Sequence, residues 1–159
     1  LGFSAYLQHL FQGMDLTDGA GNLSPLLLLA NNLRACAVTM LYGLIPFVRL
    51  PALALGVNAV LLGGLAACYA ATDTTMLLYA ASLLPHGIFE LPALILAFSM
   101  GLYICGHLTR RCRRDPAALP LGACLGLAAR LLVFLLLPLL ILAALTEAYV
   151  TPLAAGLFL

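Results

Sequence analysis

Residues 131–145 read LLVFLLLPLLILAAL, a run without one charged or polar side chain. The apolar stretch around it extends over about 121–148, and a helix needs roughly 20 such residues to cross a bilayer. The whole chain of 159 residues is 64% hydrophobic and 8% charged, whereas soluble domains are about 45–50% apolar and about 25% charged. The composition excludes a soluble enzyme, a disordered chain and a nucleic-acid-binding protein. It predicts an all-α, multi-pass membrane protein.

Three further apolar segments precede this run, over about 25–45, 52–71 and 75–106. The first begins at Ser24-Pro25, a helix cap followed by proline at the first helical position. The sequence therefore predicts a membrane helix bundle with about four spans.

The third segment is too long for one simple crossing, and Pro85-His86-Gly87 interrupts it. The residue before a proline is pushed away from helical geometry. We therefore predict a short helix over 75–83, a break, and a second helix over 85–106. If the short helix instead enters the membrane and returns to the same side, the loops before it lie on the opposite sides of the membrane.

Residues 4–14 place Tyr6, Leu7, Leu10 and Phe11 at helical spacing. This pattern is typical of an amphipathic helix that lies in the membrane interface. We therefore expect one membrane domain over residues 1–159. Its parts are an N-terminal interfacial helix with its loop over 1–22 and the helix bundle over 23–153.

Four of the seven basic residues lie in one loop: Arg110, Arg111, Arg113 and Arg114. Arginine-rich loops beside a span remain in the cytoplasm, and they also contact anionic lipid head groups. We therefore expect a protein of the cytoplasmic membrane with residues 107–119 in the cytoplasm. Five cysteines, an odd number, do not indicate a disulfide framework.

Several polar side chains fall within the apolar segments, where an ionisable group costs about 2.5–3.5 kcal/mol on insertion scales. We expect these residues to form an intramembrane polar cluster: Asn31, Asn32, Arg34, Asn58, His86, Glu90, Glu147 and Thr151. His86 and Glu90 are four residues apart and share one helix face. Arg34 is expected to pair with Glu90 or Glu147.

This cluster is open to three interpretations. It stabilises the helix break, it forms a proton, ion or substrate site, or it forms a metal or catalytic site. Because a second histidine is not nearby, we assign no catalytic residue, no metal and no cofactor.

Small residues at helical spacing permit close helix contacts. Gly122-x-x-x-Gly126 and Gly63-Gly64 are the examples here. The sequence does not decide whether their partner is the same chain or a second copy.

Three motifs together resemble the stage II sporulation protein M family. They are Asn31-Asn32-Leu33-Arg34, the stretch Pro85-His86-Gly87-Ile88-Phe89-Glu90-Leu91-Pro92-Ala93, and Glu147-Ala148-Tyr149-Val150-Thr151-Pro152. The resemblance covers about residues 5–153. It implies an integral protein of the cytoplasmic membrane. In spore formers the named member works with two partner proteins in septal peptidoglycan remodelling, as an anchor or scaffold and not as the hydrolase. Relatives also occur in organisms that do not sporulate, so the resemblance does not by itself imply sporulation for this chain. The chain begins with Leu1, which a fragment, a processed form or a change of numbering would explain. Full-length members usually carry a further N-terminal membrane helix, which favours the fragment.

The leading functional hypothesis is a non-enzymatic scaffold or anchor for a membrane or cell-envelope remodelling complex. Its expected partners are the lipid bilayer, other membrane or envelope proteins and a second copy of the chain, and not nucleic acid. One alternative is a small transporter or channel that uses His86, Glu90 and Arg34 as a polar pathway. The other is a membrane-embedded, metal-dependent enzyme.

Overall fold

The computed structural model describes residues 24–71, 76–151 and 153, and all the regular structure within them is helical. Its elements in chain order are α2 (Pro25–Tyr42), α3 (Leu50–Ala71), α4 (Met76–Cys112), α5 (Leu121–Leu131), the π-helical turn η1 (Leu132–Leu136), α6 (Leu137–Leu145) and the π-helical turn η2 (Thr146–Val150). Within these residues, four helices are long and apolar enough to cross a membrane. The predicted all-α fold with four spans is confirmed, whereas the predicted interfacial helix over 4–14 lies outside the described residues.

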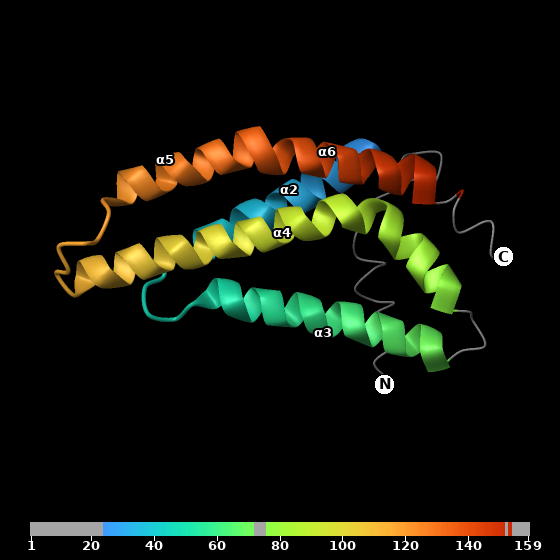
Figure 1. Cartoon of the computed structure of the whole chain (residues 1–159), viewed down its shortest axis with the longest axis horizontal. Helices are drawn as coiled ribbons and strands as arrows, with labels where there is room; N and C mark the ends of the chain where they lie inside the picture. Colours follow the sequence, from blue (N-terminus) through green and yellow to red (C-terminus); the bar gives the residue numbers. More distant parts are fainter. Residues whose placement is uncertain (1–23, 72–75, 152, 154–159) are drawn as a thin grey trace.

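The fold is organised around α4, which contacts α2, α3 and the last long helix formed by α5, η1, α6 and η2 (Figure 1). The buried core lies between α2, α4 and this last helix, and includes Met40, Ala97, Ile104, Leu136 and Leu140. The outermost helix is α3, in which Pro51 is the buried residue. Most of the surface of α3 is therefore left uncovered by the other described helices.

Two glycines bring three helices together at one level of the bundle. A Cβ atom on Gly101 of α4 would lie 2.7 Å from the carbonyl oxygen of Thr39 and 2.8 Å from Cγ of Pro51. A Cβ atom on Gly43 would overlap the carbonyl group of Gly101. The end of α2 and the start of α3 can thus approach α4 only because side chains are absent at these positions.

The third segment differs in form from the prediction. The helices expected separately over 75–83 and 85–106 are one 37-residue helix, α4, which contains both Pro85 and Pro92. Proline removes a backbone donor and its ring displaces the carbonyl one turn earlier, so the helix bends. Figure 1 shows this bend in the N-terminal part of α4. The predicted break at Leu84 is therefore wrong, and the segment bends without ending.

The last helix widens twice into a π-helical turn. The first, η1, comes directly before Pro138, where the missing backbone N–H and the bulk of the ring disfavour regular α-helical bonding. The second, η2, contains Glu147, and the backbone N–H of Thr151 donates to the carbonyl oxygen of Thr146, five residues earlier. Such turns occur frequently at functional sites.

Candidate functional site

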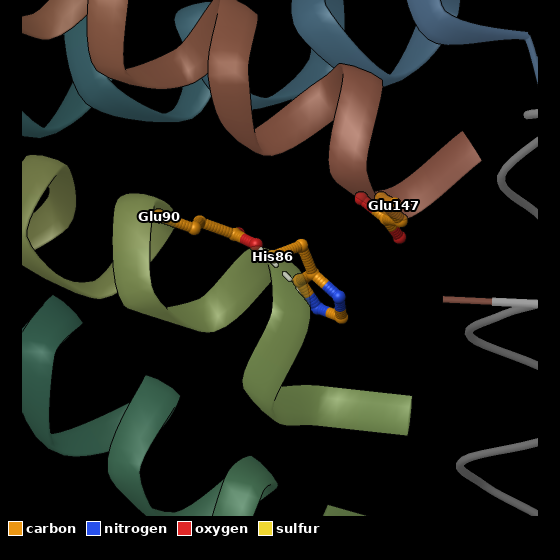
Figure 2. Close-up of side chains that lie close together, drawn as sticks. All are labelled: His86, Glu90 and Glu147. Carbon is orange, nitrogen blue, oxygen red and sulfur yellow. Dashed lines mark ion pairs between the residues drawn. The ribbon is translucent and has the colours of Figure 1, made fainter. Parts of the chain in front are cut away.

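His86 and Glu90 of α4 and Glu147 of η2 converge at one end of the bundle, as Figure 2 shows. One nitrogen or oxygen atom from each residue lies within 4.8 Å of the others. Nε2 of His86 is 3.9 Å from Oε2 of Glu90. The spacing of four along α4 explains the first pair, and packing of η2 against α4 supplies Glu147.

The hydroxyl group of Thr151 contacts the ring of His86. The Thr151 hydroxyl donates its single hydrogen to the carbonyl oxygen of Thr146 at 3.2 Å. Its oxygen lies 3.3 Å from Nδ1 of His86, and the tautomer of the ring decides which of the two donates. Nε2, the other ring nitrogen, faces the carboxylate of Glu90.

The cluster is neither fully buried nor fully exposed. The side chains of His86 and Glu90 are 12% and 23% exposed. Within the described residues no arginine forms an ion pair with Glu90 or Glu147. Two carboxylates thus lie close together, with the imidazole of His86 beside them.

The cluster lies far from the arginine-rich loop along α4. His86 is 24 positions before Arg110 in this helix, a distance of about 36 Å at 1.5 Å per residue. Glu147 lies near the end of the Leu121–Val150 span. The cluster and the arginines therefore occupy opposite ends of the bundle.

The remaining residues of the predicted cluster are placed differently. Asn32 is buried at 9% exposure, and Asn31 is half-buried. Arg34 is exposed. In the described part of the chain no hydrogen bond or ion pair joins these three side chains to the glutamates. The predicted pairing of Arg34 with Glu90 or Glu147 is therefore wrong, because Arg34 faces away from the core.

Asn58 approaches the cluster from the other side of α4. Its Nδ2 donates to the carbonyl oxygen of Ala54 at 2.9 Å, within α3 itself. Asn58 and Glu90 line one groove of about 290 Å³ between α3 and α4, whose other walls include Leu55, Leu94 and Phe98. The two polar groups thus face the same space without a direct bond.

The arginine end of the bundle contains a second feature that the sequence does not reveal. A cavity of about 320 Å³ lies at this end. It is lined by Phe47 and Arg49, by Thr109, Arg110 and other residues of α4, and by Arg113 directly after α4. The backbone N–H of Phe47 donates to Oγ1 of Thr109 at 3.0 Å, and the guanidinium of Arg113 lies 5.8 Å from the Phe47 ring centre.

Arg49 is therefore a neighbour of Arg110 and Arg113. In the sequence, the charge of Arg49 beside two prolines was the one sign that this residue has a role.

These features define a class of protein before they define a family. The long apolar helices and their exposed apolar surfaces show a multi-pass helical membrane protein in contact with the lipid bilayer. The family model of the stage II sporulation protein M family matches residues 5–152, and the chain belongs to this family. No curated protein and no solved structure matches the chain.

Proposed function

We propose that this protein is a non-enzymatic docking component, a scaffold or anchor, of a membrane or cell-envelope remodelling complex. The proposal rests on one observation, which is that small residues of α5 and α3 face away from the other helices. A Cβ atom added at Gly122 or Gly126 of α5 would have no neighbour within 4 Å, and the same holds for Gly63 of α3. These glycines lie in motifs that suit close helix contacts, and their Cβ positions face none of the other helices that the structure describes.

The close packing inside the chain uses other glycines, Gly43 and Gly101. A helix surface of small residues that no intrachain partner covers suits a transmembrane helix of another polypeptide, which includes a second copy of this chain. Family membership is consistent with this role, since the family is named after a protein of stage II of sporulation. The open surface of α3 adds a second helix for such contacts.

We further place the arginine end of the bundle in the cytoplasm and the chain in the cytoplasmic membrane. Arg49 and the loop after α4 present five arginines at this end: Arg49, Arg110, Arg111, Arg113 and Arg114. Such an asymmetry orients membrane proteins. It also favours contacts with anionic lipid head groups, which suits an anchor. The polar cluster then lies toward the opposite face of the membrane.

The transporter alternative receives less support from the groove beside Glu90. Its walls are apolar apart from Asn58 and Glu90. A solute or ion that moved along such a groove would lose its hydration without gaining polar contacts. We therefore retain the docking role.

A photo-crosslinking residue at position 126, introduced in the native host, tests the docking proposal. We expect adducts with a discrete polypeptide from position 126 and none from position 97, which is buried. In a second experiment the crosslinker is placed at position 127, and Gly126→Leu should lower the adduct yield at least about fivefold without changing the melting temperature. A leucine there meets no atom of its own chain but fills the surface that a partner needs.

Gly106→Leu is the matched control for this experiment, since Gly106 also faces open space but lies on α4 near the arginines. It should leave the adduct yield from position 127 unchanged. Adducts with lipid alone, or equal yields from Gly126→Leu and the unmodified chain, would contradict the docking role.

A further inference from the structure

We propose that His86, Glu90 and Glu147 bind one divalent transition-metal ion, with Zn²⁺ as the representative ion. The site would join α4 to the last helix of the bundle. It goes beyond the docking role and does not depend on it, because it rests on the polar cluster and not on the outward glycines.

The positions of the donor atoms suit such an ion. Zn²⁺ binds nitrogen and carboxylate oxygen at about 2.0–2.2 Å, so tetrahedral donors stand about 3.4 Å apart. The donors of this cluster are within 4.8 Å of one another, and Nε2 of His86 is 3.9 Å from Oε2 of Glu90. These separations exceed the ligand spacing by at most about 1.4 Å, which is the movement that the side chains have to supply.

The histidine is already oriented as a ligand. Metal-bound histidines usually donate their second ring N–H to an oxygen, which fixes the ring and its tautomer. In this cluster the Thr151 hydroxyl oxygen lies 3.3 Å from Nδ1, in reach to accept that N–H when Nε2 binds an ion. The hydroxyl is itself held by the carbonyl oxygen of Thr146 in η2. In the tautomer with its proton on Nδ1, Nε2 offers its lone pair to an ion between His86 and Glu90.

Charge balance also favours a divalent cation. Two carboxylates in a region of low polarity need compensation, because an unpaired buried charge is costly. Arg34 and Arg130 are both exposed and form no ion pair with the glutamates in the described part of the chain. One divalent ion beside a neutral imidazole and two carboxylates gives a site of zero net charge.

The donor set selects among metals. Three protein ligands that include one imidazole suit Zn²⁺ and its transition-metal neighbours, with a water molecule in the fourth position. Ca²⁺ requires six to eight oxygen ligands, and Mg²⁺ prefers oxygen ligands in an octahedron. The partial exposure of His86 and Glu90 leaves a route for the ion and the water from the nearby end of the bundle.

The test uses the purified chain in detergent with a non-histidine affinity tag. Cys112 is exposed, so every sample carries Cys112→Ser to remove that thiol. After removal of metals by a chelator, Zn²⁺ is titrated while bound metal and melting temperature are recorded. We expect about one Zn²⁺ per chain and a rise in melting temperature, because an ion that binds only the folded state stabilises it.

Glu147→Gln and His86→Gln should each weaken Zn²⁺ binding at least about tenfold, and Thr151→Val about 10–100-fold through loss of ring orientation. Glu147→Gln removes one of two adjacent carboxylates, so without metal it should be at least as stable as the parent chain. His107→Gln is the matched control, since this histidine lies near the arginines and accepts from the backbone N–H of Leu119.

Several results would overturn the site. They are the lack of Zn²⁺ binding up to about 100 µM, equal binding by the parent chain and Glu147→Gln, and equal stabilisation by Mg²⁺ or Ca²⁺. A loss of binding in His107→Gln as large as that in His86→Gln would place the ion elsewhere and would also contradict it.

Discussion

Gly101→Leu is expected to destabilise the bundle strongly, by more than the truncation of a buried leucine. Its Cβ atom alone would lie 2.7 Å from the Thr39 carbonyl oxygen and 2.8 Å from the Pro51 ring. These are atoms of two other helix segments and not ends of flexible side chains. Overpacking in a well-packed core costs about 1–3 kcal/mol, and the upper end applies where backbones must separate. Reversible unfolding in mixed micelles measures this loss.

Gly106→Leu and Gly126→Leu provide the controls for this prediction. At both positions an added Cβ atom meets nothing within 4 Å, so the free energy of unfolding should stay within about 0.5 kcal/mol of the parent value. If Gly101→Leu is as stable as these controls, the close approach of α2, α3 and α4 does not exist in the membrane.

Leu140→Ala should cause the second-largest loss of stability. Leu140 of α6 is 0% exposed in the core that this helix shares with α2 and α4. In soluble proteins such a change costs about 2–5 kcal/mol, of which part is transfer of the side chain from water. In a bilayer the unfolded helices remain in an apolar solvent, so the packing and cavity part is what remains. We therefore expect a loss of about 2 kcal/mol.

Leu142→Ala is the matched control, since it makes the same change two residues away on the same helix. Leu142 is 46% exposed on the lipid-facing side, so its truncation should cost less than about 0.5 kcal/mol. Equal losses from Leu140→Ala and Leu142→Ala in the same unfolding assay would show that α6 does not bury the face assigned to it.

The apolar runs allowed the first, second and fourth spans to be predicted to within about three residues, whereas the predicted end of the third at 106 lies six residues before the end of α4. Composition decides this part, because each helix must satisfy its own backbone in lipid. The course of α4 was not predictable in the same way. Pro85 signals a disturbance, but whether a helix ends or bends there depends on the neighbours that pack against it. In this bundle α4 continues for 37 residues.

The candidate site was predictable only where its residues share a helix. The spacing of His86 and Glu90 gives their common face directly. The approach of Glu147 and Thr151 depends on the π-helical turn η2 and on the packing of the last helix against α4. Neither the π-helical turn nor this packing can be predicted from the spacing of residues in the sequence. Arg34 shows the converse, because its depth in the span indicated a partner while its helix face points outward.

At the end of the bundle opposite the arginines, α4 and the last helix form one polar unit. A double-mutant cycle between His86→Ala and Thr151→Val tests this unit most directly, with His107→Ala and Thr151→Val as the control pair. Unfolding free energies are measured in mixed micelles without metal. We predict a coupling of about 0.5–1.5 kcal/mol for His86 with Thr151 and none for the control pair. Effects of His86→Ala and Thr151→Val that add to within about 0.3 kcal/mol would contradict the unit.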